Sequence, residues 1–143
     1  MDTKDVDQCI WCDRDEALEK VVREIASFPT GTLYLHRDQT HRGRCIFAYK
    51  EHLRKITELS REQYMALMGD IHTSVLAITK ALSPDKVNIL ILGDTSEHMH
   101  IHLCPKYRDG KQWGVPFAVD EAKPLLLDDA ALHILVDRMK EYI

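Results

Sequence analysis

The sequence predicts an α+β fold, in which one largely antiparallel sheet carries helices on a face. Two observations lead to this class. Stretches with apolar residues at helical spacing alternate along the chain with short strand-like runs, and one of those runs has a histidine at every second position. The length of 143 residues and the hydrophobic content of 45% suit one compact domain over residues 1–143.

The first expected element is a short N-terminal helix over residues 13–28, which ends at Pro29-Thr30-Gly31. Asp13 or Asp15 would cap it, because a carboxylate at this position accepts hydrogen bonds from the first backbone N–H groups of a helix. The apolar residues at helical spacing are Ala17, Leu18, Val21, Val22 and Ile25.

Two strand-like runs follow, over residues 32–35 and 44–50. A polar segment that ends at Gly43 joins them, so we expect a hairpin or meander. The longest helix should come next. Residues 60–63, Ser-Arg-Glu-Gln, have the form of a capping box, and an apolar stripe continues from there toward Leu82.

The second half of the chain predicts a strand pair and a final helix. Residues 87–92 form a nearly continuous apolar run that is typical of a buried strand, and a turn at residues 93–96 leads from it into the histidine-rich strand. These two strands should pair antiparallel. The chain is then basic and irregular beyond Pro105, and the last helix should begin near Asp128. Its apolar residues are Leu132, Leu135, Val136 and Met139.

The most informative run is residues 98–102, which read His-Met-His-Ile-His. Because successive side chains of a strand point to opposite faces, the three imidazoles should share one face and the apolar residues should enter the core. Same-face residues lie about 7 Å apart, so the rings could line an anion-binding pocket more easily than they could all bind one metal ion. A neutral imidazole can attack phosphorus, and its neighbours can handle protons. We assign no role to His41, His72 and His133.

Composition narrows the function classes. A net charge of −4 leaves no electrostatic footprint for duplex nucleic acid, whereas 19 Lys and Arg suffice for a local phosphate pocket. No apolar run approaches ~18 residues and the polar run at residues 1–5 is no signal peptide, so we expect a cytoplasmic protein without a membrane partner. The four cysteines indicate metal ligands or buried thiols rather than disulfides, and Cys45 and Cys104 should be packed thiols.

Together these residues resemble the histidine triad (HIT) nucleotide hydrolases and transferases, whose signature is His-x-His-x-His with apolar residues between. Cys9-Ile10-Trp11-Cys12 resembles the Cys-x-x-Cys of zinc-carrying members, and residues 43–52 resemble the family's glycine, apolar strand, lysine and histidine. The long helix follows in the expected place, and Pro105-Lys106-Tyr107 resembles the segment after the triad. The resemblance covers about residues 9–113 and implies a HIT-like sheet of about five strands, with residues 114–143 as an extension that carries a helix.

The resemblance implies a covalent mechanism. In such proteins the middle histidine attacks the α-phosphate of a nucleotide, and water or another acceptor resolves the nucleotidyl-enzyme intermediate. By position this nucleophile is His100. His102 would contact phosphate and help to orient the site, and the flanking His98 completes the catalytic set.

The resemblance also implies substrate contacts. Thr95 would lie beside the leaving group, and Asp94 stands where the family has a glutamine, which could alter the preference for phosphate or leaving group. The ribose would be held near residues 35–38, for which His36 and Asp38 are both candidates. Lys106 either contacts phosphate or only faces solvent.

In zinc-carrying members the metal ligands would correspond to Cys9, Cys12, His52 and His98. Two thiolates and two imidazoles make a closed tetrahedral set, which favours structural zinc over catalytic zinc. Buried thiols or a redox pair are the alternatives for the two cysteines, although no βαβ pattern surrounds them to favour a redox role. The resemblance further implies a homodimer.

The function implied is hydrolysis of a phosphoanhydride or phosphoramidate bond in a nucleotide, with release of a nucleoside monophosphate. The chain is similar to HIT proteins of the diadenosine polyphosphate hydrolase type, so dinucleoside polyphosphates are the first expected substrates and nucleoside phosphoramidates the second. A different class of function also stays open. Asp94 in place of an amide would suit a zinc-stabilised nucleotide-binding or scaffold protein with little catalysis.

Overall fold

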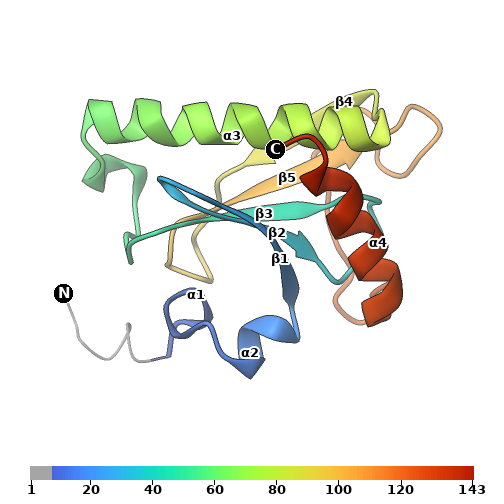
Figure 1. The fold of residues 1–143 in the computed structure, drawn as a ribbon, viewed down its shortest axis with the longest axis horizontal. Helices are drawn as coiled ribbons and strands as arrows, with labels where there is room; N and C mark the ends of the chain where they lie inside the picture. Colours follow the sequence, from blue (N-terminus) through green and yellow to red (C-terminus); the bar gives the residue numbers. More distant parts are fainter. Residues whose placement is uncertain (1–7) are drawn as a thin grey trace.

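The computed structural model describes residues 8–143, and these form an α+β fold with one five-stranded antiparallel sheet, as predicted (Figure 1). The strands are β1 (Val22–Phe28), β2 (Gly31–His36), β3 (Cys45–Tyr49), β4 (Lys86–Leu90) and β5 (His100–Lys106). The helices are α1 (Ile10–Asp13), α2 (Glu16–Glu19), α3 (Arg61–Leu82) and α4 (Asp129–Lys140), with a 3₁₀ turn at Ile56–Glu58. The run at residues 1–5, on which the expectation about a signal peptide rests, lies outside the described residues.

The strands follow one another across the sheet in the order β1-β2-β3-β5-β4. Both predicted pairings are confirmed, because β2 pairs antiparallel with β3 and β4 pairs antiparallel with β5. Strand β5 is hydrogen-bonded on both sides, and His102 lies opposite Ile46 of β3 and opposite Leu90 of β4. His100 and His102 are therefore held inside the sheet, and His98 lies just before β5. Strand β4 forms one edge of the sheet and is only partly buried, so the prediction of a buried strand over residues 87–92 is wrong.

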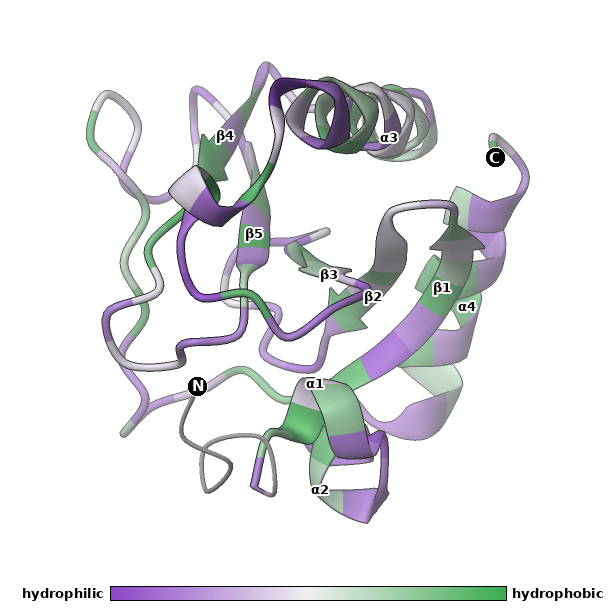
Figure 2. Ribbon diagram, turned by 90° about the vertical axis from the view of Figure 1, so that its left-hand side faces the viewer, coloured by the Kyte–Doolittle hydropathy of each residue, from purple (hydrophilic) through white to green (hydrophobic). Residues whose placement is uncertain are grey.

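The predicted N-terminal helix over residues 13–28 is wrong. Asp15 does cap a helix, α2, but this helix has only four residues, and β1 takes the rest of the predicted stretch. The spacing of the apolar residues suggested a helix because both faces of the sheet are covered by other parts of the chain. Val22 packs on one face of β1 and Ile25 on the other, so two residues three positions apart are both buried without a helix. Figure 2 shows how hydrophobic and hydrophilic residues follow one another along β1.

The larger core lies between the sheet and helices α3 and α4, which cover one face (Figures 1 and 2). Met99, Ile101 and Leu103 enter this core as predicted. From α4 the predicted residues are all buried, namely Leu132, Leu135, Val136 and Met139. A smaller core on the opposite face joins the sheet to α1 and α2, and consists of Trp11, Leu18, Val22, Tyr34, Ile46 and Ala48.

The two long helices begin at the residues that the sequence indicates. Ser60 accepts a hydrogen bond from the Gln63 backbone, and the Gln63 side chain accepts one from Ser60, which completes the capping box of α3. Asp128 caps α4 by accepting from the backbone of Ala131. Among residues 8–143, no helix is long and apolar enough to cross a membrane.

Leu33 offers a test of the larger core, because its side chain is completely buried beneath α3 and α4. Leu33→Ala should lower the free energy of unfolding by about 2–5 kcal/mol, since it removes buried methyl groups and leaves a cavity. Urea denaturation measures this change. The same substitution at Leu126, which is 63% exposed, should change stability by less than about 0.5 kcal/mol. Equal losses in the two variants would contradict the assignment of the core.

Candidate active site and metal-binding cluster

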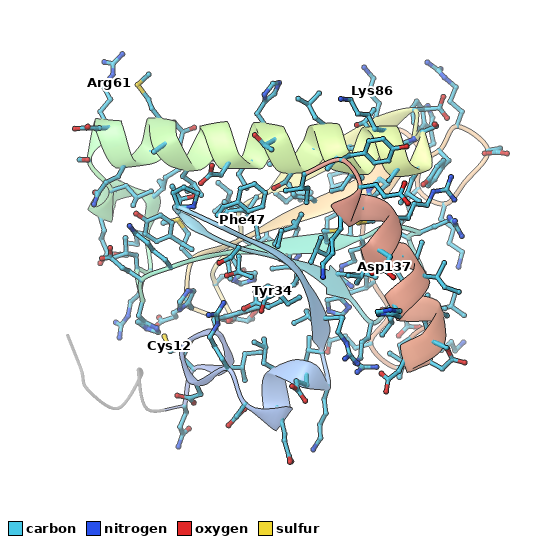
Figure 3. All side chains as sticks on the ribbon, viewed as in Figure 1. Cys12, Tyr34, Phe47, Arg61, Lys86 and Asp137 are labelled. Atoms are coloured by element: carbon cyan, nitrogen blue, oxygen red, sulfur yellow. The ribbon has the colours of Figure 1, made fainter. Side chains whose placement is uncertain are left out.

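The three histidines lie on the face of the sheet opposite α3. His100 pairs with Ala48 and His102 with Ile46, and both partners belong to the smaller core. Figure 3 shows the two faces, with Phe47 between the sheet and α3, and with Tyr34 and Cys12 on the other side. The alternation along β5 thus separates the imidazoles from the main core. Helix α1 and its N-cap residue bring the two cysteines, Cys9 and Cys12, to the imidazole face, close to His98.

Backbone carbonyls set the orientation of two of the rings. Nδ1 of His100 lies 2.7 Å from the carbonyl oxygen of His98, and Nε2 of His98 lies 2.7 Å from the carbonyl oxygen of Tyr49. A carbonyl oxygen can only accept, so each of these nitrogens carries the proton. In the neutral rings, the lone pair is then on Nε2 of His100 and on Nδ1 of His98. The first is placed for attack on a substrate and the second for a metal ion.

Two rings flank His100 on the imidazole face. The indole of Trp11 stacks on it with ring centroids 5.5 Å apart and an interplanar angle of 23°, and the His102 ring lies 5.0 Å away edge-on. Burial, together with the charges of His100 and Arg44, lowers the pKa of His102 to about 4. His102 is therefore neutral at neutral pH and can donate a hydrogen bond from one ring nitrogen while the other accepts.

The predicted metal ligands Cys9, Cys12, His52 and His98 come together in one cluster. Their ligand atoms all lie within 4.8 Å of one another. Nδ1 of His98 is 3.4 Å from each of the two sulfurs, and Nδ1 of His52 is 3.5 Å from that of Cys12. A tetrahedral zinc ion, with bonds of about 2.3 Å to sulfur and about 2.0–2.1 Å to nitrogen, spaces its sulfur and nitrogen ligands about 3.5 Å apart. The donor set and its spacing therefore fit zinc.

Protonation in the cluster also bears on metal binding. Burial and the neighbouring Cys9 thiol raise the pKa of Cys12 to about 11, so a metal ion must displace protons when it binds. Burial lowers the pKa of His98, which keeps this ring in the neutral form that ligates metals. His98 also links the two parts of the site, because its side chain belongs to the cluster and its carbonyl oxygen orients His100.

Asp94 and Thr95 are neighbours in the chain but line different cavities. Asp94 is exposed and lines a cavity of about 510 Å³ together with His100. Thr95 lines a separate cavity of about 440 Å³ beside His52 and His98. Asp94 thus shares a cavity with His100, the predicted nucleophile, whereas Thr95 shares one with two of the predicted metal ligands.

The remaining predicted substrate contacts have different environments. His36 ends β2 on the imidazole face, half-buried, and its Nδ1 accepts a hydrogen bond from the Asp38 backbone. Asp38 is buried, and its Oδ1 accepts from the backbone N–H groups of Thr40 and Leu125. Lys106 is also buried, and its ammonium group donates to two carbonyl oxygens. These belong to Gln112 and Val115. Asp38 and Lys106 therefore hold the C-terminal segment against the sheet.

Sequence reasoning missed four residues of this face, namely Trp11, His41, Arg44 and Phe117. Arg44 is the one with a signal in the sequence. It stands two positions before Ile46 in a strand, so the same alternation that groups the histidines places Arg44 on their face. Trp11 reaches the site from α1, whereas His41 and Phe117 reach it through loops, whose course no local pattern predicts.

Loss of one cluster ligand should abolish metal binding. Cys12→Ala should lose stoichiometric zinc in elemental analysis, because three ligands leave an open and weaker site. Chelation of the wild-type protein should lower Tm, since metal that binds only the folded chain stabilises it. Cys104→Ala is the matched control, because that buried thiol lies outside the cluster and its removal should leave the zinc content unchanged. Full zinc content in Cys12→Ala would contradict the assignment.

The buried histidines should make the protein less stable in acid. Burial, then Arg44, lowers the pKa of His36 from 6.5 to about 4, so between these values the unfolded chain binds more protons than the folded one. Stability should then rise with pH across this window, by roughly 1.4 kcal/mol per pH unit for this group. His36→Gln should reduce the slope measured by urea denaturation at several pH values. The same substitution at the exposed His72 serves as control, and identical slopes in wild type and His36→Gln would refute the assignment.

Comparison with known proteins identifies the fold. No protein-family model and no curated protein matches the sequence. Among solved structures, a histidine triad protein from Bradyrhizobium japonicum is 20% identical, with 90% of this chain and 96% of that chain covered and a TM-score of 0.79. A histidine triad (HIT) protein from Sinorhizobium meliloti is 19% identical, with coverage of 90% and 95% and a TM-score of 0.80. A Zn-bound histidine triad family protein from Mycobacterium smegmatis is 18% identical, with coverage of 95% and 96% and a TM-score of 0.67. The chain thus has the fold of the histidine triad proteins.

Proposed function

We propose that this chain is a nucleotide hydrolase that releases a nucleoside monophosphate through a covalent intermediate on His100. The observation that carries the proposal is the hydrogen bond between Nδ1 of His100 and the carbonyl oxygen of His98. It holds the proton on Nδ1 and leaves the lone pair of Nε2 for attack, in a fold shared with histidine triad proteins.

The reaction has two displacements at the same phosphorus atom. The Nε2 lone pair of His100 forms a bond to the α-phosphorus, and the bond from phosphorus to the leaving oxygen or nitrogen breaks, with the electron pair going to the leaving group, which takes a proton from solvent water. A water molecule then attacks phosphorus and gives a proton to solvent, the phosphorus–nitrogen bond breaks with its electron pair returning to Nε2, and the nucleoside monophosphate leaves with His100 regenerated. His102 is neutral and lies 5.0 Å from the His100 ring, so its N–H can stabilise the charge on the phosphoryl oxygens.

We propose dinucleoside polyphosphates as the first substrate class and nucleoside phosphoramidates as the second. His36 is the better candidate for the sugar hydroxyls, because Asp38 already accepts hydrogen bonds from the C-terminal segment and from its own loop. Asp94 shares a cavity with His100 and so would act on the choice of leaving group. Lys106 has no proposed substrate contact, since its ammonium group is buried against backbone carbonyls.

The zinc ion that we propose for the cysteine and histidine cluster has a structural role. Trp11 lies between the ligands Cys9 and Cys12 in the sequence, and its indole stacks on His100. A metal that joins both cysteines to His98 would therefore hold Trp11 against the nucleophile. The four protein ligands fill a tetrahedral shell, so the chemistry stays with the triad.

A homodimer is part of the proposal. Strand β4 is an edge of the sheet, and its outer surface continues into exposed apolar residues. These residues are Ile89, Ile91, Leu92, Trp113 and Val115, with exposed fractions of 37–62%. An exposed apolar patch at a sheet edge favours association with a partner, and a second copy of this chain would cover it.

His100→Ala should abolish release of nucleoside monophosphate from both diadenosine tetraphosphate and adenosine phosphoramidate, because no other group can form the covalent intermediate. Chromatography of the two reactions measures the product and shows which bond is preferred. His72→Ala should retain wild-type turnover, since that imidazole is exposed on α3. Turnover in His100→Ala equal to wild type would refute the nucleophile. Nucleotide binding without turnover in the wild type would instead favour a binding or scaffold protein.

A further inference from the structure

The ring of Phe117 lies among three nitrogen-bearing side chains on the imidazole face. Its centroid is 5.7 Å from the His41 ring, 5.7 Å from the His102 ring and 5.6 Å from the central guanidinium carbon of Arg44. His41 lies in the loop before β3, His102 lies in β5, and Arg44 is the residue immediately before β3. One apolar ring thus separates three groups that can bind an anion.

Each of the three groups has a buried nitrogen without a partner. Among residues 8–143, no hydrogen bond is made by Nε of Arg44, Nδ1 of His41 or Nδ1 of His102. Arg44 and His41 are only 6% and 5% exposed, so solvent does not replace the missing bonds. Burying a polar group without a partner costs free energy, which indicates that these atoms have a partner in another state of the protein.

The surroundings of the three nitrogens favour negative charge. Arg44 is a permanent cation, and its ion pair with Asp38 is long, with 3.8 Å between the guanidinium nitrogen and the carboxylate oxygen. Burial lowers the pKa of His41, the hydrogen bond to Gln112 opposes this shift, and the charges of Lys106, Arg44 and Lys111 add to it. The charge of Arg44 also depresses the pKa values of His36 and His102.

Phe117 belongs to a segment that is attached to the sheet at its two ends. At one end Gln112 contacts His41 and Lys106, and at the other end Leu125 pairs with residues 38 and 39. Between these attachments residues 113–124 are exposed apart from Phe117 and Val119, which are half-buried. Within this stretch the Phe117 ring contacts the imidazole face and the Val115 carbonyl oxygen accepts a hydrogen bond from Lys106, and Phe117 belongs to neither core cluster.

We infer that Arg44, His41 and His102 form a second phosphate subsite, which Phe117 covers in this structure. A phosphate group would offer oxygen acceptors to Nε of Arg44 and to Nδ1 of His102. Nε2 of His41 donates to Oε1 of Gln112, so Nδ1 of this ring carries the lone pair and would donate to phosphate only when the ring is protonated. His102 lies 5.0 Å from His100 and 5.7 Å from Phe117, so the covered position is next to the triad. The inference rests on the proposed function in one respect, namely that the phosphate belongs to the same substrate as the one His100 attacks.

Titration calorimetry with inorganic phosphate tests the subsite without any need for turnover. Phe117→Ala should bind phosphate about tenfold more tightly than wild type, because it uncovers a charge-assisted site. Arg44→Gln in the Phe117→Ala protein should return the affinity to the wild-type value. The triad is the same in these proteins, so the difference between them measures the covered position. Leu125→Ala is the control, since its side chain is exposed in the same segment.

A variant that gains phosphate affinity distinguishes a change at the subsite from loss of the fold, because a misfolded protein would not bind more tightly. Asp38→Asn in the Phe117→Ala background should strengthen phosphate binding further, because it removes the carboxylate charge near Arg44 and keeps the Oδ1 acceptor for Thr40 and Leu125. Unchanged phosphate affinity in Phe117→Ala, or affinity unaffected by Arg44→Gln, would overturn the inference.

Turnover separates this inference from the proposed function. Phe117→Ala should raise kcat/KM for diadenosine tetraphosphate several-fold and leave it unchanged for adenosine phosphoramidate, which has a single phosphate. Equal changes for both substrates would show that the subsite does not serve the substrate. A protein without turnover that still binds phosphate through Arg44 would refute the proposed function and support the subsite.

Discussion

Strand β5 is paired on both sides, with β3 and with β4, and this pairing is the constraint on which both the core and the site depend. A strand held in this way has two faces that cannot exchange, since a slip of one residue would bury the imidazoles under α3 and expose the apolar residues. Ile101 and Leu103 lie completely buried on one side, and the ring of His102 lies on the other. Burial of the core residues therefore fixes the direction of the histidine side chains.

A single residue, His98, connects the metal-binding cluster to His100, the predicted nucleophile. Its side chain lies 3.4 Å from the sulfurs of Cys9 and Cys12, and its carbonyl oxygen accepts the hydrogen bond from His100. A metal that immobilises the His98 ring also immobilises the backbone on which the orientation of His100 depends. Through this connection, a metal ion bound at the cluster would support the orientation of His100.

The C-terminal segment gives several polar residues of the sheet their partners. Asp38 and Lys106 both bind its backbone, and Phe117 packs against Arg44 and His41. Asp38 and Lys106, which the sequence suggested as substrate contacts, thus bind the C-terminal segment where it crosses the imidazole face. A buried polar group needs a partner, and the backbone of the segment supplies one to Asp38 and to Lys106.

The sequence by itself determined the elements whose signals are local. Alternation placed His98, His100 and His102 on one face, and the caps at Ser60 and Asp128 marked where two helices begin. The tertiary structure decided what depends on contacts between distant segments. It made residues 22–28 a strand, because both sheet faces are covered and burial at a spacing of three no longer implies a helix. Only the folded chain decided which polar residues bind the C-terminal segment and which remain without partners, because those contacts join loops far apart in the sequence.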